Sequence, residues 1–367
     1  MPNSFEIASS SGNYGVTVGV GLFQNAARAH KDAIYLVDSF LAPSLGVAED
    51  RLISIVATEQ QKSLECMPQT FARLRELGAN RSTYLIAVGG GVIQDIATLV
   101  ASLYMRGLPW SYLPTTLLGM VDSCIGGKSS INVAGYKNLI GNFHPPKDIF
   151  VDVEFSRTLT REQIVGGLME AAKIGYARGQ ADFDAYLTES PSASMSPQQI
   201  EAVSLRSLST KKWFIEIDEF DQKERLLLNF EHTFGHAIEA GTSFGVSHGV
   251  AIGIGMIVAV NLALSRSWLS PTGQRNTLAL VKHVKDMLGA IAGEILMPQK
   301  IELDKLLDKF DSDKKHRSDR FQIVCPCADG RLELVPMDKD AESRHDIQSA
   351  FHNAFVQIGW SDLVVRD

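Results

Sequence analysis

The segment from Ser82 to Met105 constrains the fold more than any other part of this 367-residue chain. It reads STYLIAVGGGVIQDIATLVASLYM, an apolar run followed by three glycines and then by apolar residues at helical spacing. That order predicts a buried strand, a tight turn and a helix. Other short apolar runs end near Asp38 and cover residues 51–57 and 110–116. Because strands alternate with amphipathic segments, the sequence predicts a parallel α/β sheet.

The pattern changes near residue 158. Residues 160–177, 196–218 and 270–288 have helical periodicity and begin with residues that favour helix starts. We therefore expect two domains. Residues 1–157 would form a Rossmann-like α/β domain with a parallel sheet, and residues 158–367 a mainly α-helical domain that carries the metal and substrate sites.

Charge and hydropathy exclude several classes of protein. The formal net charge is −7, which argues against a nucleic-acid partner. The longest apolar run, residues 249–260, is shorter than the ~20 residues needed to cross a bilayer, so it predicts a buried core helix. The N-terminal segment lacks the pattern of a signal peptide. We expect a cytoplasmic protein without a membrane partner, whose four cysteines are reduced thiols.

Histidines gather in the segment from Leu226 to Gly249. His232 and His236 lie one helical turn apart, and His248 follows. Upstream, GGLMEAAK places Glu170 and Lys173 on one helical face. Histidine and glutamate from separate elements form metal sites that keep a coordination position open for catalysis. The sequence thus predicts a metal-dependent enzyme, and spacing alone pairs His232 with His236.

The three glycines after the strand suggest a nucleotide site. Glycine lets backbone amides approach a diphosphate, and the start of a helix attracts its negative charge. The spacing differs from the G-x-G-x-x-G fingerprint, and a simple tight turn is the alternative. Asp38, Glu59 and Lys62 follow earlier strands, where they suit ribose hydroxyls. Together these features favour a dinucleotide.

Positively charged residues are interleaved with glycines and apolar residues in several segments. Such a pattern favours a pocket for phosphate or carboxylate over scattered surface charges. The polar and charged residues of these segments are Arg106, Asp122, Lys128, Lys137, Asn138, Lys211, Arg225, Lys314 and Lys315.

From Asp38 to the DKK segment, the chain resembles the sugar phosphate cyclase superfamily and, within it, the 3-dehydroquinate synthases. The resemblance rests on ordered motifs, here GGG…D, YMRG, PTTLL.MVDS..GGK, KN.IG, GG..E..K, LN..HT.GHAIE and HG. It implies NAD and one divalent metal, zinc or cobalt, as cofactors. It also implies a homodimer and a phosphorylated sugar acid as substrate.

The resemblance assigns roles residue by residue. It implies that Glu170, His232 and His248 bind the metal, and that His236 acts in catalysis instead of binding the ion. The other implied catalytic residues are Lys128, Lys173, Arg225 and Asn229. The implied substrate-binding residues are Arg106, Asp122, Asn138, Lys211 and Lys314. The implied NAD-binding residues are Asp38, Glu59, Lys62, Gly90, Gly91, Asp95, Thr115, Thr116, Lys137, Phe155 and Thr158.

The activity implied by the resemblance is the cyclisation of 3-deoxy-D-arabino-heptulosonate 7-phosphate to 3-dehydroquinate with loss of phosphate, a step of the shikimate pathway. NAD⁺ would be reduced and then reoxidised within each turnover, so that the net reaction is that of a lyase. One alternative is another cyclase of the amino-dehydroquinate, 2-deoxy-scyllo-inosose or 2-epi-5-epi-valiolone synthase type. A further alternative is a metal-dependent polyol dehydrogenase.

The sequence departs from the usual motifs of the family at a few positions. Gln94 and Glu231 stand where glycine is common, Val250 where glutamate is frequent, and Thr98-Leu99 where Gly-Phe is common. AGYKN replaces the usual PLGKN. None of these departures removes a residue that the resemblance implies for the site, but they leave the identity of the sugar phosphate open.

Overall fold

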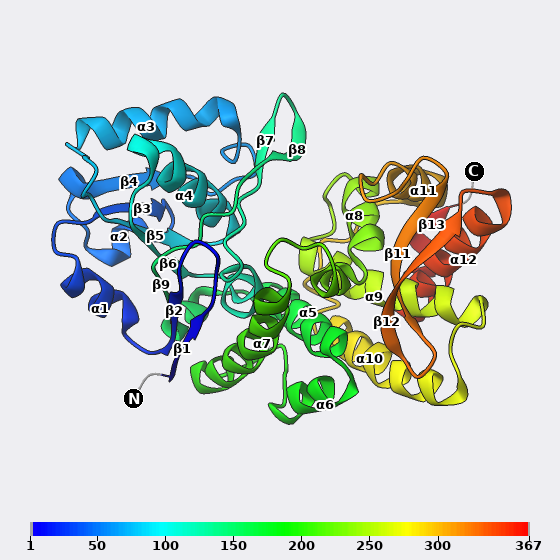
Figure 1. Cartoon of the computed structure of the whole chain (residues 1–367). Coiled ribbons are helices and arrows are strands. Elements are labelled where there is room, and N and C mark those ends of the chain that lie inside the picture. The colour runs from blue at the N-terminus through cyan, green and yellow to red at the C-terminus, as the bar shows by residue number, and fades with distance from the viewer. Residues whose placement is uncertain (1–2, 366–367) are drawn as a thin grey trace. The chain divides into compact units, whose positions relative to one another are not determined.

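The computed structural model describes residues 3–365, which form two compact units (Figure 1). Unit 1 comprises the chain up to Leu159 together with Ser196–Glu219. Unit 2 comprises Thr160–Met195 and the chain from Phe220 onward.

This division differs in one respect from the two continuous domains that the sequence predicts. Helix α7 (Pro197–Ile217) falls within the range predicted for the second domain, yet it groups with unit 1. There the amide of Asn3 donates to Glu201 at 3.2 Å, and the backbone N–H of Ala8 donates to Glu216 at 2.9 Å. Helical periodicity predicts that a helix forms but not which core it joins.

Unit 1 is built around a seven-stranded sheet with the order β1-β2-β9-β6-β5-β3-β4. Every neighbouring pair is parallel except β1 and β2, and β7 and β8 form a separate antiparallel pair. The strands are β1 (Asn3–Ile7), β2 (Tyr14–Gly19), β3 (Ile34–Asp38), β4 (Leu52–Ile55), β5 (Leu85–Gly89), β6 (Trp110–Pro114), β7 (Ile131–Val133), β8 (Tyr136–Ile140) and β9 (Asp148–Asp152). The other helices are α1 (Leu22–Ala29), α2 (Ala42–Leu45), α3 (Met67–Glu76) and α4 (Gly91–Leu103).

The strand order creates a switch point beside β3. The chain passes from β3 outward to β4 and then returns to β5 on the other side of β3. In open parallel sheets, ligands bind at such a point, beyond the carboxyl ends of the strands. Asp38 ends β3 and Gly89 ends β5, so the predicted nucleotide residues lie at the switch point.

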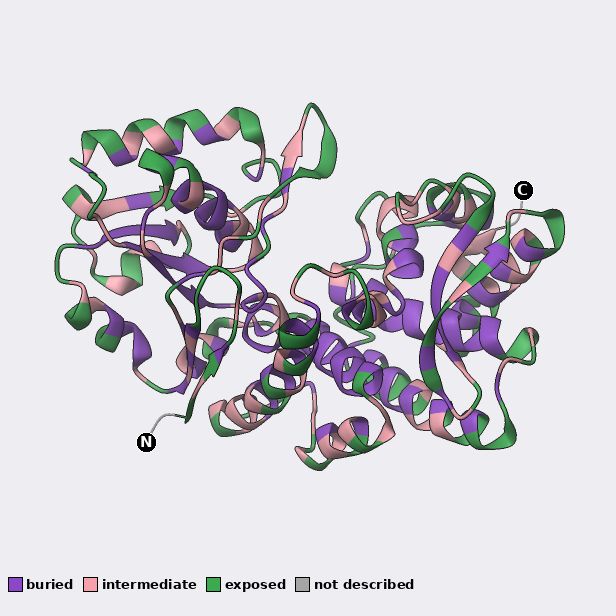
Figure 2. Cartoon of the chain, viewed as in Figure 1, coloured by how far each residue is buried: buried purple, intermediate pink, exposed green. Residues whose placement is uncertain are grey.

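The central strands of this sheet are buried because their side chains are apolar on both faces, as a sheet covered by helices requires. Ile86, Val88 and Leu113 are fully buried and form a cluster with Tyr35 and Val37. Figure 2 shows these strands as the most buried part of the unit. The predicted parallel α/β fold and the predicted strands are confirmed.

Unit 2 is mainly helical, as predicted. Its helices are α5 (Arg161–Arg178), α6 (Gln180–Thr188), α8 (His232–Gly241), α9 (His248–Ser265), α10 (Pro271–Ala290), α11 (Leu303–Asp311) and α12 (Ala341–Gln357). Its strands are β10 (Ile301–Glu302), β11 (Arg320–Cys327), β12 (Arg331–Asp338) and β13 (Val364–Val365). The antiparallel β11–β12 hairpin, which the sequence analysis does not predict, packs beside α9.

Helix α9 forms the core of unit 2, since it packs against α5, α8, α10 and α12. Among the described residues, it is the one helix long and apolar enough to pass a length-and-composition test for a membrane span, and its mean hydropathy is 1.8. However, 83% of its residues are buried inside the protein (Figure 2). The prediction of a buried core helix is therefore confirmed.

Candidate active site

The glycine turn of unit 1 joins β5 to α4 as predicted. Gly90 caps the helix with an extended backbone, and Gly91 is its first residue. A Cβ on Gly90 would lie 2.9 Å from Cγ2 of Thr116, so the turn has no room for a side chain there. A Cβ on Gly91 would meet no atom within 4 Å. The start of α4 is therefore open and presents backbone N–H groups, as an anion site requires.

Lys62 and Asp95 connect three segments next to this turn. Nζ of Lys62 lies 3.1 Å from Oδ2 of Asp95 and donates to Oδ1 of Asn138 at 2.9 Å. The backbone N–H of Ser130 donates to Asp95 at 2.9 Å. Burial raises the pKa of Asp95 to about 6, although Lys62 and the hydrogen bonds act against this shift. The pair ties α4 to the β7–β8 hairpin.

The remaining residues predicted for NAD lie at several places in unit 1. Asp38 accepts a bond of 3.1 Å from the backbone N–H of Phe40, and the exposed Glu59 accepts one of 2.8 Å from Asn132. The backbone N–H of Thr115 donates to Gly89 at 3.1 Å. Lys137 is exposed on β8. Phe155 and Thr158 follow β9. Phe155 packs against the sheet core, and the hydroxyl of the exposed Thr158 donates to the backbone carbonyl of Phe155 at 2.9 Å.

Asp122, which is half-buried, and Lys211, which is buried, form an ion pair within unit 1. Asp122 lies in a π-helical turn, Gly119–Ser123, a type of turn often found at functional sites. Nζ of Lys211, on α7, lies 2.5 Å from Oδ1 of Asp122 and donates to its backbone carbonyl at 2.7 Å. Two residues predicted for the substrate site are thus in direct contact.

Arg106 does not join this group. It is exposed and lies in the turn before β6, so it is at the edge of the sheet where strands begin. The glycine turn lies at the opposite edge, where β5 ends. Lys128 is also exposed, with its Nζ 5.9 Å from the ring centre of Phe143.

Gln94 replaces a residue that is usually glycine, and the structure shows what the side chain does. Its amide donates to the carbonyl of Ser123 at 2.6 Å and accepts from the Ser123 hydroxyl at 2.8 Å. The Thr98 hydroxyl, another departure, donates to the backbone carbonyl of Gln94 at 2.8 Å. The two bonds between Gln94 and Ser123 join α4 to the π-helical turn that carries Asp122. Val250 is fully buried in α9, and nothing in the structure explains its replacement of glutamate.

In unit 2, two glycines bring the predicted metal ligands together. A Cβ on Gly249 would lie 2.1 Å from Cα of Gly166, so α5 and α9 touch through their backbones. Glu170 follows Gly166 by one helical turn, and His248 precedes Gly249. As a result, Nε2 of His248 lies 3.2 Å from Oε1 of Glu170. Lys173, one turn further along α5, forms a buried ion pair with Glu170.

Three histidine rings converge at this place. The ring centres of His232 and His236 are 5.2 Å apart, and that of His248 lies 6.3 Å and 6.2 Å from them, respectively. Each of two rings bonds a carboxylate through Nδ1. His232 lies 2.6 Å from Oε1 of Glu231, and His248 lies 3.0 Å from Oε2 of Glu239.

The charges of the cluster are strongly coupled. Burial acts against a charged His248 ring, but its bonds to Glu170 and Glu239 raise its pKa to about 10. Although burial favours a neutral carboxyl, Lys173 and His248 hold the pKa of Glu170 well below its usual range. Burial and Lys173 lower the pKa of His232. His236 reaches the surface of unit 2, yet the surrounding protein and Lys315 lower the pKa of its ring to about 4.

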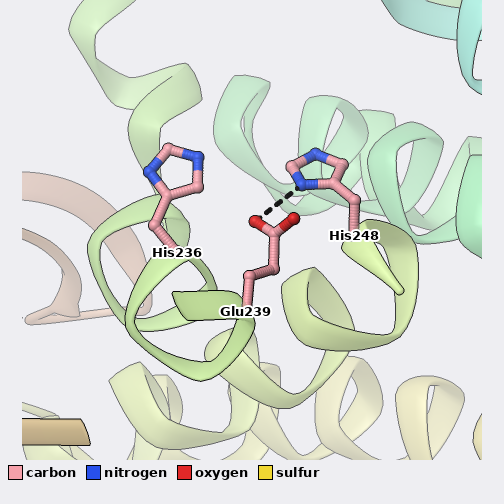
Figure 3. Close-up of side chains that lie close together, drawn as sticks. All are labelled: His236, Glu239 and His248. Carbon is pink, nitrogen blue, oxygen red and sulfur yellow. Dashed lines mark hydrogen bonds and ion pairs between the residues drawn. The ribbon is translucent and has the colours of Figure 1, made fainter. Parts of the chain in front are cut away.

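The donor set suits zinc or cobalt, which bind imidazole nitrogen and carboxylate oxygen. Two ligand groupings share His248. In one, which the resemblance implies, Glu170 and His232 complete the set. In the other, the ligand atoms of His236, Glu239 and His248 all lie within 4.8 Å of one another (Figure 3). The assignment of the metal to Glu170, His232 and His248 is a prediction, and the two groupings differ in the role they give to His236.

The DKK segment places Lys315 nearest to the cluster. Lys314 is exposed, whereas Nζ of Lys315 is buried and has no hydrogen-bond partner within residues 3–365. Burial lowers the pKa of Lys315, and its charge acts on Glu231, His232 and His236. Arg225 is buried, and the side-chain amide of Asn229 donates to Leu226 at 3.1 Å. The geometry therefore favours Lys315 over the predicted Lys314 as the cation of this segment at the cluster.

Three residues of the cluster have no role among those that the resemblance implies. Glu239 lies one turn after His236 within the GHAIE motif, so spacing could have suggested it. Lys315 is adjacent in sequence to the predicted Lys314, and the two lysines differ in how far they are buried. For Glu231, the one signal in the sequence is that a glutamate stands where glycine is common in the family.

A Rossmann-like sheet with an open glycine turn, combined with a helical unit that holds a histidine–carboxylate centre, defines a class of two-unit enzymes that includes the sugar phosphate cyclases. A solved 2-deoxy-scyllo-inosose synthase complexed with carbaglucose-6-phosphate, NAD⁺ and Co²⁺ matches with a TM-score of 0.80 and 22% identity, over 96% of this chain and 99% of the other. ValA, a 2-epi-5-epi-valiolone synthase from Streptomyces hygroscopicus subsp. jinggangensis 5008 with NAD⁺ and Zn²⁺ bound, matches with a TM-score of 0.77 and 25% identity, over 95% and 99%.

The chain belongs to the 3-dehydroquinate synthase family. The family models for the 3-dehydroquinate synthase N-terminal and C-terminal domains match residues 52–166 and 167–316. The 3-dehydroquinate synthase of Xylella fastidiosa (strain M23) is 32% identical over 354 residues, which cover 90% of this chain and 94% of the relative. That of Idiomarina loihiensis is 37% identical over 298 residues, 80% and 81% of the two chains. The predicted resemblance is confirmed.

Proposed function

We propose that this chain is a 3-dehydroquinate synthase, a carbon–oxygen lyase that converts 3-deoxy-D-arabino-heptulosonate 7-phosphate to 3-dehydroquinate and phosphate. The observation that carries the proposal is the contact between Glu170 and His248, which the close crossing of α5 and α9 creates beside Lys173. Relatives that share most of the chain carry this activity in their names.

NAD and one divalent metal ion, zinc or cobalt, complete the proposed enzyme. When bound, the nucleotide supplies reversible hydride transfer and the ion supplies a Lewis acid. The open start of α4 and Asp38 at the switch point suit the nucleotide, since N–H groups bind diphosphate and a carboxylate binds ribose. Glu170, His232 and His248 are the proposed ligands of the metal.

The chain's own residues would bind and orient the substrate. Lys173 keeps Glu170 ionised, and Lys128, Lys211, Arg225 and Lys315 supply positive charge for phosphate and carboxylate. His236, whose pKa is about 4, is neutral near pH 7 and can accept a proton or a hydrogen bond from a substrate hydroxyl. Asp122, Asn138 and Asn229 offer polar contacts to the other hydroxyls. We also propose a homodimer in the cytoplasm, as the resemblance implies.

The decisive experiment measures phosphate release from two sugars, with NAD⁺ and metal-loaded protein. We expect release from 3-deoxy-D-arabino-heptulosonate 7-phosphate and none from sedoheptulose 7-phosphate, without net formation of NADH. NADH is reoxidised in each turnover, so its absorbance should stay constant. Release from sedoheptulose 7-phosphate alone would reassign the chain to another cyclase, and accumulation of NADH would indicate a dehydrogenase.

A further inference from the structure

Glu231 occupies an energetically unfavourable position in unit 2. Its backbone has φ 68°, in the left-handed region that favours glycine, and it lies at the cap position before α8. Glu231 is 1% exposed, and its Oε2 has no hydrogen-bond partner among the residues that the structure describes. Burying a carboxyl group and straining a backbone both cost free energy, so such a residue persists where the surroundings or the function require it.

A glycine on the neighbouring helix leaves space for Glu231. On α9, a Cβ at Gly255 would lie 2.9 Å from the carbonyl oxygen of Glu231 and 3.2 Å from its Cβ. The absence of a side chain at Gly255 therefore lets α8 and α9 approach where Glu231 enters the cluster. The buried Nζ of Lys315 interacts electrostatically with Glu231.

The side chain of Glu231 bonds to His232, between Oε1 and Nδ1 at 2.6 Å. This bond occupies Nδ1 and fixes the plane of the ring, so that Nε2 is the nitrogen left to bind a metal ion. A ligating histidine commonly bonds a carboxylate through its other nitrogen, which orients the ring and increases its basicity. Glu239 makes the corresponding bond to His248.

We propose that Glu231 is a positioning residue of the metal centre, which orients His232 and strengthens its bond to the ion. The inference rests on the proposed function only in requiring that the chain binds a divalent metal. It predicts a centre in which each of the two histidine ligands is held by its own carboxylate, Glu231 for His232 and Glu239 for His248.

The test measures metal affinity in the absence of substrate, by competition of a chelator for Zn²⁺ and by the visible absorption of bound Co²⁺. We expect Glu231→Gly and Glu231→Met to weaken Zn²⁺ binding by about 10- to 100-fold. Both should also change the Co²⁺ spectrum. Glu231→Gln keeps an oxygen that accepts from Nδ1–H, and it should restore much of the affinity. Glu239→Gln is the matched comparison at His248, and Glu342→Gln, at an exposed ion pair, is the control.

Thermal unfolding of the metal-free protein separates positioning from a merely structural role. Glycine adopts a positive φ without strain, so Glu231→Gly should raise the melting temperature while it weakens metal binding. Zn²⁺ affinity and Co²⁺ spectra of Glu231→Gly and Glu231→Met equal to those of the wild type would overturn the inference. So would equal losses in the glutamine and methionine variants. If the wild type itself bound no metal, the proposed metal centre would fail, a result distinct from either.

Discussion

His248 is the residue shared by both possible ligand groupings. It bonds Glu170 through one ring nitrogen and Glu239 through the other. In the grouping that the resemblance implies, His236 belongs to the catalytic residues. In the compact grouping of Figure 3, the same ring is a ligand. The two groupings therefore predict different results for the same pair of substitutions.

We expect His248→Ala to remove both bound metal and turnover, and His236→Ala to retain metal and lose turnover. The reason is that Nε2 of His248 already faces Glu170, whereas His236 would act on the substrate. Metal content by atomic absorption and phosphate release test this directly. Replacing the exposed His345 by alanine is the control. Metal retained in His248→Ala but lost in His236→Ala would contradict the assignment to Glu170, His232 and His248.

Sequence reasoning found most candidate residues of the histidine cluster but not the contacts between them. Helical spacing placed Glu170 beside Lys173 and His232 beside His236. It could not relate α5 to α9, because their approach depends on two glycines 83 positions apart, Gly166 and Gly249. Nor could it distinguish Lys315 from Lys314, since neighbouring residues differ in burial only once the segment is folded.

At the scale of elements, Lys62 and Asp95 join α4 to the β7–β8 hairpin. Burial raises the pKa of Asp95 from its usual 3.8 to about 6. Between these two pH values the folded protein keeps the proton that the unfolded chain releases. The free energy of unfolding therefore falls as pH rises from about 4 to about 6. Above that range Asp95 is ionised in both states, and its contribution no longer changes with pH.

We expect this single group to lower the free energy of unfolding by on the order of 2 to 3 kcal/mol across that interval. Asp95→Asn should lack this dependence, because an amide does not titrate. Urea unfolding of both proteins at several pH values measures the difference, which cancels the contributions of other groups. Parallel pH curves would show that Asp95 titrates normally.

The elements themselves were largely predictable, because their signals are local. The strands ending at Asp38 and Gly89, the glycine turn and the long helices all follow from periodicity and from glycine positions. The partner of α7 was not predictable, since its packing against β1 and β2 depends on residues about 200 positions earlier. The β11–β12 hairpin lies in the range that the sequence predicts to be mainly helical.

At the scale of the whole molecule, the two proposed cofactor sites belong to different units with separate cores. We expect Gly91→Ala to weaken NAD binding at least about tenfold, ~1.4 kcal/mol, by filling the open start of α4. The same variant should bind metal normally. His248→Ala should lose the metal and still bind NAD. Calorimetric titration with NAD⁺ and metal analysis of both variants measure this.

Gly91→Ala and His248→Ala are controls for each other, because each should lose one cofactor and keep the other. Outside its own helical turn, a Cβ at Gly91 would meet no atom of the described residues within 4 Å, so the melting temperature of Gly91→Ala should not fall. Loss of both cofactors from either single substitution would contradict the independence of the two sites.

The return of the chain from unit 2 to unit 1 has a consequence for synthesis on the ribosome. Domains often fold as units while the chain emerges, N-terminal first. Here the last segment of unit 1, Ser196–Glu219, follows α5 and α6 of unit 2. Unit 1 therefore cannot complete its fold until α7 has been synthesised. By then α5 and α6 of unit 2 have already left the ribosome, but α9, against which α5 packs, has not yet been made. Translation speed and chaperone supply over residues 160–219 should thus influence the yield of folded enzyme more than they would for two domains encoded one after the other.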